Sequence, residues 1–289
     1  MAGESNIELF KKYIDLLDDV YKQGSKTAVL DTADVLVHLT GANEFKVPKL
    51  DMDGLGEYSR KDGYVKGGVT LTYETKTPDY DRGRKFSIDA MDDEESVGIA
   101  FGKLASEFVR TKVTPELDAY RFAKLCASAG TTSTGALTSG TDVLEILNRY
   151  QAAMTDREVP EEGRVLFITP ALYALADNVD SNKNKTVLSR FAHVIQVPSS
   201  RFVSKIDLQD GLSSGEEAGG FKKAGDGKSI NFMIVAPSAV MQVSKHVVNK
   251  VIDPVLNQTD DGWLFFYRSY GLCDVYDNKK AGIIVHTEA

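Results

Sequence analysis

The sequence predicts a mixed α+β fold, because stretches with helical periodicity and stretches with strand periodicity occur in separate parts of the chain. Residues 69–75 alternate apolar and polar side chains through Tyr73, as a half-buried strand does. Residues 97–109 place apolar side chains on one helical face, and residues 247–289 contain closely spaced aromatic runs typical of strands. With 289 residues, 42% of them hydrophobic, the chain can bury a sizeable core.

The composition argues against several classes of protein. The net charge of −8 disfavours sequence-specific binding of nucleic acid, because an acidic protein repels the phosphate backbone. Cys126 and Cys273 are the only cysteines and have neither zinc-site nor redox spacing, so two reduced thiols are expected. No apolar stretch reaches the roughly 20 residues of a membrane span, and the first residues lack the pattern of a signal peptide. Synthesis in the cytoplasm is therefore expected.

The first 88 residues predict a helix followed by a hairpin. Residues 6–23 space their apolar side chains as an amphipathic helix does; this helix either packs in the core or docks as an arm on a neighbouring subunit. Residues 44–88 are rich in glycine and contain the alternating run, which predicts a long β-hairpin. Because an isolated two-stranded ribbon is marginal in water, this hairpin needs a partner surface.

A long helix is expected after the hairpin. Residues 89–95 carry five acidic side chains and no basic one, which suits the positive end of a helix dipole. The apolar face of residues 97–109 extends this helix to an end or bend at Thr114 and Pro115, where Thr114 is expected to cap a second helix over residues 116–129.

The region that follows predicts strands alternating with helices. Residues 131–140 are small and polar and predict a linker, whereas residues 207–228, rich in Gly, Ser and Lys, predict a mobile excursion. No internal repeat is found. Helices are expected at residues 142–154 and 170–176, and strands at residues 165–168, 193–197, 230–235 and from 240 onward.

The sequence contains no familiar catalytic motif. The four histidines, at positions 38, 193, 246 and 286, lack metal-ligand spacing, and there is no G-x-S-x-G elbow. Residues 225–229 fall short of a phosphate-binding loop, because Lys222 stands where the motif needs glycine and a strand is expected to follow. Residues 177–184 lack the spacing of a calcium loop. We therefore expect no enzyme activity, catalytic residue, metal or cofactor.

Opposite charges gather in the hairpin region and at the start of the long helix. Residues 54–88 hold seven Lys or Arg against five acids, and residues 89–95 are wholly acidic among their charged side chains. We hypothesise a contact between subunits that pairs these charges; the alternative is that both are solvated faces, since exposed pairs contribute only about 0–1 kcal/mol. The residues of this hypothesis are Arg60, Lys61, Lys66, Arg82, Arg84 and Lys85 on the basic side, and Asp92, Asp93, Glu94 and Glu95 on the acidic side.

Three segments resemble parts of tailed-bacteriophage major capsid proteins: residues 76–86, the turn at residues 197–202, and the ending at residues 263–286. None is a chemical signature; the resemblance lies in their order and covers nearly the whole chain. It implies the Hong Kong 97-type capsid fold, of α+β class. The implied parts are an N-terminal arm (1–42), an extended β-hairpin E-loop (43–88), a P-domain with a spine helix (89–130, completed by 246–289) and a mixed α/β A-domain (131–245).

The resemblance also implies a function and partners. The chain would self-assemble as pentamers and hexamers into an icosahedral shell enclosing double-stranded DNA, without sequence-specific binding. A portal protein is implied at one vertex and, because only about 42 residues precede the hairpin, a separate scaffolding protein or none. A decoration protein is a further candidate partner, and no membrane is involved. The expected location is the virion capsid, after synthesis and assembly in the host bacterial cytoplasm.

Covalent crosslinking between subunits, known in some relatives, is not expected. Lys61, Lys66 and Asn257 supply the lysine and asparagine types that such a bond needs, but no glutamate lies between Asn257 and Glu288.

Two other functions remain open from the sequence. An encapsulin-type bacterial compartment shares the shell fold but houses enzymes instead of DNA. A soluble α/β enzyme with an unrecognised site is the alternative from a different class, because strands and helices alternate between residues 165 and 235.

Overall fold

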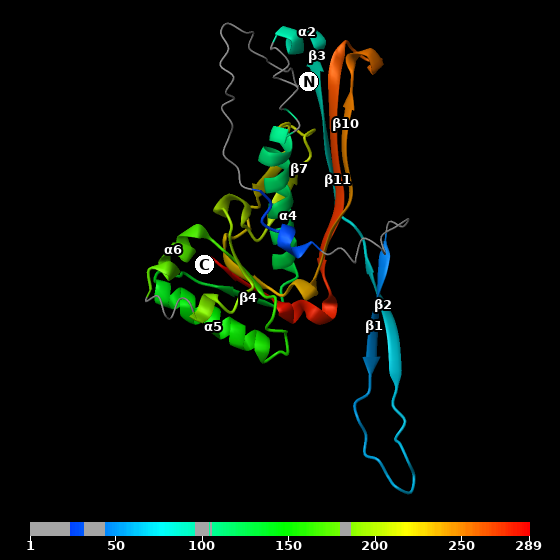
Figure 1. Cartoon of the computed structure of the whole chain (residues 1–289), viewed down its shortest axis with the longest axis vertical. Coiled ribbons are helices and arrows are strands. Elements are labelled where there is room, and N and C mark those ends of the chain that lie inside the picture. Colours follow the sequence, from blue (N-terminus) through cyan, green and yellow to red (C-terminus); the bar gives the residue numbers. More distant parts are fainter. Residues whose placement is uncertain (1–23, 32–43, 96–103, 105, 180–185) are drawn as a thin grey trace.

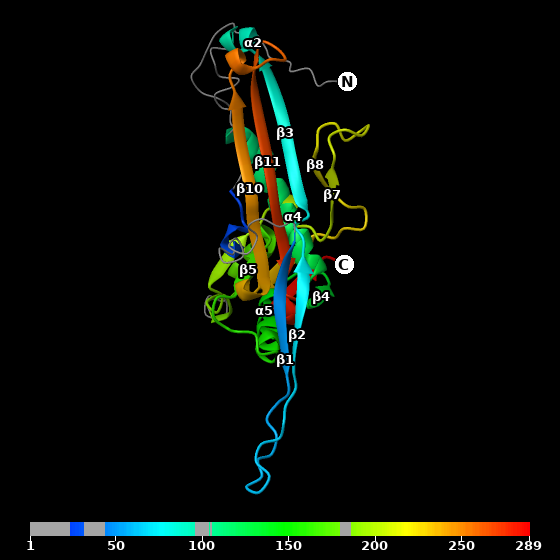
Figure 2. The same cartoon turned by 90° about the vertical axis from the view of Figure 1, so that its right-hand side faces the viewer.

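The structure, a computed structural model, describes residues 24–31, 44–95, 104, 106–179 and 186–289. The helix expected at residues 6–23 lies outside the described residues, as do residues 96–103 of the expected long helix. The molecule is elongated: a layered α/β unit adjoins a long upright sheet, and a hairpin projects away from both (Figures 1 and 2). The mixed α+β class predicted from the sequence is confirmed.

A five-stranded mixed sheet forms the centre of the α/β unit. Its strands are ordered β4-β12-β9-β5-β6, with β12 parallel to β4 and antiparallel to β9. Strands β5 and β9 are buried along their whole length, as the apolar run of β5 and the mainly apolar run of β9 predict. The bounds are β4 (Thr131–Thr134), β5 (Val165–Ile168), β6 (His193–Gln196), β9 (Ile230–Val235) and β12 (Ile283–Thr287).

Alternate residues of the central strands serve two different cores. Val165 and Phe167 of β5 belong to a core that contains Phe122 of helix α4 (Thr114–Ala127). Leu166 belongs to the opposite core, together with Leu147 of helix α5 (Gly140–Thr155) and Leu172 of helix α6 (Pro170–Asp177). The sheet is therefore enclosed between α4 on one face and α5 with α6 on the other, which follows from the period-two alternation of a strand.

A second sheet of three antiparallel strands forms the upright part of the molecule. It has the order β10-β11-β3, with bounds β10 (Val240–Ile252), β11 (Gly262–Val275) and β3 (Tyr80–Asp89). Phe265 of β11 lies opposite Phe86 of β3 in the register. Phe108, from the helix that precedes α4, packs edge-on against Phe86 at a centroid distance of 4.8 Å and against Tyr267 at 5.7 Å. These aromatic contacts hold the sheet on the helix.

The helix passes Thr114 and Pro115 without a new capped start, so the predicted cap is wrong. A π-helical turn, η2 (Val109–Val113), runs directly into α4, and the Thr114 backbone N–H donates to Val109 O. The Thr114 hydroxyl donates to the same carbonyl at 3.0 Å instead of capping. Pro115 lacks an N–H and its ring crowds the carbonyl four residues earlier, and a wider π turn accommodates both.

Two segments expected to lack regular structure contain strands. Residues 131–134 of the predicted linker form β4, which pairs with β12, because a run of threonines suits an edge strand. The predicted excursion at residues 207–228 contains an antiparallel pair, β7 (Ile206–Gln209) and β8 (Gly220–Lys223).

The hairpin predicted over residues 44–88 is shorter than expected. Strands β1 (Phe45–Met52) and β2 (Val69–Lys76) pair with each other, whereas β3 joins the upright sheet. The remaining short elements are η1 (Ala28–Leu30), α2 (Ala90–Glu95), η3 (Ser199–Arg201), η4 (Pro237–Ala239), η5 (Pro254–Leu256) and η6 (Asp277–Gly282).

Candidate assembly surfaces

The hairpin β1–β2 has one apolar face and one polar face. Antiparallel pairing places residues that are opposite one another on the same face of the ribbon. One face carries the pairs Pro48–Tyr73, Leu50–Leu71 and Met52–Val69, and the other carries Val47–Glu74, Lys49–Thr72 and Asp51–Thr70. The large side chains of the apolar face, apart from Pro48, are 52–70% exposed. In a single chain this apolar face stays exposed, so it offers a surface that a partner can cover.

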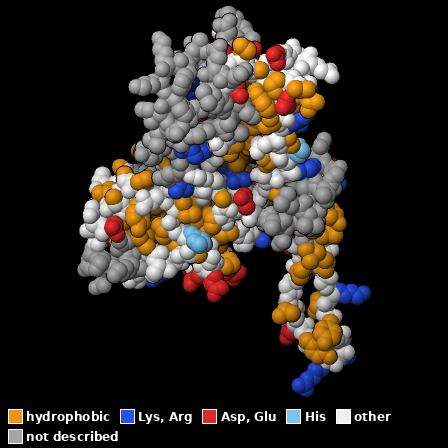
Figure 3. Space-filling model, turned by 45° about the horizontal axis from the view of Figure 1, so that its top comes forward, with side chains coloured by type: hydrophobic (Ala, Val, Ile, Leu, Met, Phe, Trp, Pro, Cys, Tyr) orange, Lys and Arg blue, Asp and Glu red, His pale blue; other side chains and the backbone are white. Residues whose placement is uncertain are grey.

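The tip of the hairpin adds exposed aromatic and basic side chains. Tyr58 and Tyr64 contact each other with ring centroids 4.9 Å apart. The backbone between them is ordered by reciprocal hydrogen bonds between Ser59 and Gly63, of 3.1 and 2.8 Å. Arg60, Lys61 and Lys66 are exposed here. Figure 3 shows apolar side chains gathered at the end of the hairpin with Lys and Arg beside them.

The opposite end of the molecule is acidic. Asp92 and Asp93 belong to α2, which also includes Glu94 and Glu95, whose side chains lie outside the described part. The turn between β10 and β11 lies beside α2, because Ala90 N–H donates to Asp261 O at 2.9 Å. This turn adds the carboxylates of Asp253, Asp260 and Asp261, which the sequence hypothesis missed. Only the pairing of β11 with β3 brings them next to α2.

The structure separates the six basic residues of the hypothesis into two groups. Arg60, Lys61 and Lys66 lie at the hairpin tip, and Arg82, Arg84 and Lys85 lie on β3 in the body. The hairpin tip and α2 lie at opposite ends of the elongated molecule, so no contact between them forms within one copy (Figure 2).

The three basic residues on β3 make contacts within the chain. Arg82 Nε lies 2.8 Å from Glu116 Oε1 of α4, and its Nη2 donates to Gln209 O at 2.7 Å. Arg84 Nη2 donates to Glu217 O at 2.9 Å, and Lys85 Nζ lies 5.7 Å from the Phe266 ring centroid. Arg82 therefore joins β3, α4 and the β7–β8 pair.

The environment of Glu116 is buried and polar. Tyr80 donates a hydrogen bond of 3.2 Å to Glu116 Oε1, beside Arg82. Burial raises the pKa of Tyr80, and the neighbouring Glu116 carboxylate raises it further. A cavity of about 370 Å³ adjoins these groups, with Phe86, Phe108 and Tyr267 among the residues that line it. The ion pair thus closes one side of an apolar hollow between β3 and the helix.

The candidate nucleophiles and metal ligands do not form a reactive site in the described part of the chain. Burial raises the pKa of the Cys126 thiol to about 11 and that of Cys273 to about 12, so both stay protonated at neutral pH and are poor nucleophiles. Among the described residues, no three His, Cys, Asp or Glu side chains are grouped to hold a metal ion. The described helices include none with the length and apolar character to cross a membrane.

No family model matches the sequence, and no curated protein matches it. Solved structures do match. The chain is similar to one titled Mycobacterium phage Che8 (13% identity, 98% of both chains, TM-score 0.68). It is also similar to the capsid structure of cyanophage P-SCSP1u (13% identity, 97% and 93% of the chains, TM-score 0.64). A third is the mature capsid of bacteriophage PhiM1 (8% identity, 99% and 92%, TM-score 0.65). The chain therefore has the mixed helix-and-sheet fold found in these phage structures.

Proposed function

We propose that this protein is the major capsid (head) protein of a tailed double-stranded DNA bacteriophage, which assembles as pentamers and hexamers into an icosahedral shell around the genome. The observation that carries the proposal is a shared fold from end to end: the match to two phage capsid structures spans 97–99% of this chain and 92–93% of theirs. A likeness to one domain of a larger protein would carry far less. The proposed location is the virion capsid, after synthesis in the host bacterial cytoplasm.

The proposal includes the Hong Kong 97-type division of the chain into an N-terminal arm (1–42), E-loop (43–88), P-domain (89–130 with 246–289) and A-domain (131–245). The projecting β1–β2 hairpin supports the E-loop assignment. The helix that packs on the β10-β11-β3 sheet supports the spine of the P-domain. The five-stranded sheet with α5 and α6 supports the A-domain, although β12 of the closing segment lies inside that sheet.

The hairpin is the proposed contact with a neighbouring copy, and its apolar face supplies most of the affinity. Fully burying one large apolar side chain contributes roughly 1.5–3 kcal/mol, whereas an exposed charge pair contributes about 0–1 kcal/mol. Burying part of Leu50, Leu71 and Tyr73 therefore outweighs several charge pairs. A contact repeated around a closed shell is strengthened further by multivalency.

The charges at the two ends give the contact its direction. Arg60, Lys61 and Lys66 of one copy are proposed to meet the acidic end of another, formed by Asp92, Asp93, Glu94 and Glu95. Asp253, Asp260 and Asp261 enlarge this acidic target. Arg84 and Lys85 remain exposed on β3 and are proposed as a second basic contact. Arg82 is assigned to the body, because it is half-buried and pairs with Glu116 of the same chain.

The proposed partners beyond the chain itself are a portal protein, a separate scaffolding protein and a decoration protein. DNA is enclosed without sequence-specific recognition, and the net charge of −8 supports this, because an acidic shell does not hold the phosphate backbone strongly.

Expression of the chain followed by sedimentation and negative-stain electron microscopy tests the proposal. Closed particles or capsomers are expected. Particles that contain an enzyme and no DNA when recovered from the native host would assign an encapsulin-type compartment instead. A persistent monomer or dimer, even with the phage's own scaffolding protein supplied, would contradict the shell function.

A further inference from the structure

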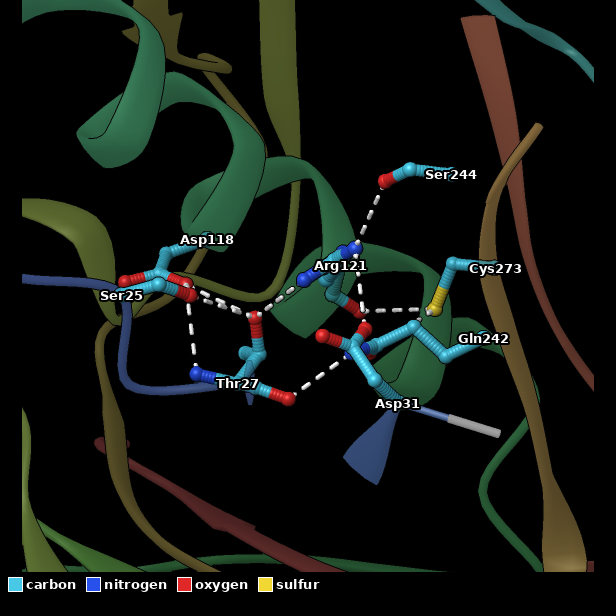
Figure 4. A network of polar contacts seen from close by, with 8 residues as sticks. All are labelled: Ser25, Thr27, Asp31, Asp118, Arg121, Gln242, Ser244 and Cys273. Carbon is cyan, nitrogen blue, oxygen red and sulfur yellow. Dashed lines mark hydrogen bonds and ion pairs between the residues drawn. The ribbon is translucent and has the colours of Figure 1, made fainter. Parts of the chain in front are cut away.

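Residues 24–31, here called the strap, lie across α4 and the start of β10 and are held by polar groups of the body (Figure 4). The carboxylate of Asp118 on α4 is fully buried and accepts four hydrogen bonds from the strap. They come from Ser25 Oγ (2.8 Å), Lys26 N (2.8 Å), Thr27 N (3.2 Å) and Thr27 Oγ1 (2.7 Å). A fifth comes from Arg201 Nη1 at 2.9 Å.

Two further side chains bind the strap beside Asp118. Arg121 Nη1 donates to Thr27 Oγ1 at 3.1 Å, and Arg121 Nη2 lies 3.3 Å from Asp31 Oδ1. Gln242 Nε2 donates to Thr27 O and to Asp31 Oδ1, both at 2.8 Å. We call Asp118, Arg121, Arg201 and Gln242 the seat. The seat comes from α4, η3 and β10, three parts of the chain that meet only in the fold.

The strap matches the seat in several chemical features at once. Ser25 and Thr27 supply hydroxyl donors two residues apart, and the backbone N–H groups of Lys26 and Thr27 point at the same carboxylate. Leu30 is 2% exposed and enters the main core. Ala28 and Val29, which lie between the buried residues Thr27 and Leu30, are exposed. The seat is a buried site that binds both side chains and backbone groups of an eight-residue segment. These are the properties of a peptide-binding site.

Without the strap, the polar side chains of the seat lose most of their hydrogen-bond partners. Asp118 would keep one hydrogen bond of five, and Gln242 Nε2 would lose both acceptors. Buried polar groups without partners are unfavourable, so an empty seat favours rebinding. The strap, in contrast, buries only Thr27 and Leu30 fully. Segments with few buried apolar contacts open locally at a lower free energy than the rest of a fold.

We propose that the seat is a peptide-binding site, that residues 24–31 are its ligand, and that this strap detaches and rebinds as a unit while the five-stranded sheet stays folded. In a shell subunit, a role that rests on the proposed function, release of the strap frees residues 24–31 to contact another copy.

Hydrogen exchange on the unassembled full chain tests the proposal, with Ser25→Ala/Thr27→Ala as the main variant. The amides of Lys26 and Thr27 are expected to exchange at least tenfold faster than in the wild type, while those of β9 are unchanged. Asp118→Asn should act similarly. Its amide NH2 would take the place of Oδ2 and could not accept the hydrogen bonds that Lys26 N and Arg201 Nη1 donate. Ser128→Ala, a hydroxyl removed from the far end of the same helix, is the control and should change neither region.

Two outcomes overturn the proposal: equal acceleration in the strap and in β9, which makes the strap part of global unfolding, or no acceleration in either. A synthetic peptide of residues 24–31, added in excess to the Ser25→Ala/Thr27→Ala chain, should slow exchange of the seat helix more than the same peptide with both alanines. Equal effects, or none, would contradict a specific seat. These readouts do not depend on particle formation, so the strap and the shell function can fail independently.

Discussion

Asp118 and Arg201 form an ion pair that is withdrawn from solvent on both sides. Arg201 Nη1 lies 2.9 Å from Asp118 Oδ2, and the side chains are 3% and 0% exposed. The two residues belong to α4 and η3, so the pair ties the helix to the loop that follows β6. A buried ion pair is weak evidence for net stability, but removing one partner leaves the other side chain buried without its counter-charge.

We predict that Arg201→Met lowers the free energy of unfolding by about 3–5 kcal/mol, because the buried Asp118 side chain loses its ion-pair partner. Urea unfolding followed by circular dichroism measures this. Lys205→Met is the matched control, since Lys205 and Asp226 form an ion pair at the surface with side chains 61% and 67% exposed. It should have a much smaller effect. Equal effects of the two variants would contradict the special role of burial.

Stability should fall as the pH drops below the ordinary histidine pKa of 6.5 because of His286. Burial lowers the pKa of this side chain, and the nearby Arg149 lowers it further. Asn231 Nδ2 donates to Gly135 O and lies 3.0 Å from His286 Nδ1, so the neutral ring accepts a hydrogen bond there. The unfolded chain binds the proton more readily, so the contribution present above pH 6.5 is lost on acidification.

His286→Gln removes this titration. The difference in unfolding free energy between wild type and variant should be largest at pH 7.5 and should shrink towards pH 5. Chemical denaturation at several pH values measures it. Parallel curves for the two proteins would show that His286 does not carry the effect.

Reversing the hairpin-tip charges should impair assembly without affecting folding. In Arg60→Glu/Lys61→Glu/Lys66→Glu, exposed side chains would meet the acidic end of a neighbour with like charge, so particle yield should fall. Salt should partly restore this yield, because it screens the repulsion. Light scattering and electron microscopy measure the yield. Lys222→Glu/Lys223→Glu/Lys228→Glu makes the same charge change in β8 and shortly after it, also at exposed positions. If both triple variants assemble equally well, the tip is not the contact.

Polar substitutions on the apolar face of the hairpin should raise the protein concentration needed for assembly by about tenfold or more. Leu50 and Leu71 lie opposite one another and are 52% and 53% exposed. Leu50→Ser/Leu71→Ser should therefore change the unfolding free energy of the single chain by less than about 1 kcal/mol. Lys49→Ser/Thr72→Ser alters the opposite face and should leave assembly unchanged. An equal loss in both variants would contradict the apolar face as the contact.

Local pattern predicted the buried helices, whose apolar residues repeat at the helical period, and the buried strands, whose residues are mainly apolar. The run Val165–Ile168 is apolar at every position and could only be enclosed. The threonines of β4 were missed because they become a strand only by pairing with β12, about 150 residues later in the chain. Thr114 was misjudged because a proline signals a helix start but a π turn accommodates it equally.

The polar sites were harder to predict than the fold. The sequence shows Asp118 and Glu116 as ordinary charged residues in a helix, and their burial depends on Ser25, Arg201 and Arg82 in distant segments. The charge hypothesis identified the basic tip and α2, but it grouped Arg82 with exposed residues. Nothing local distinguishes an arginine that binds within its own chain from one that binds a neighbour.

Strand β12 has a consequence for the timing of folding. It lies between β4 and β9, so β4 has no neighbour in the sheet until β12 is inserted. On the ribosome, the five-stranded sheet therefore cannot close before residue 287 has emerged from the exit tunnel.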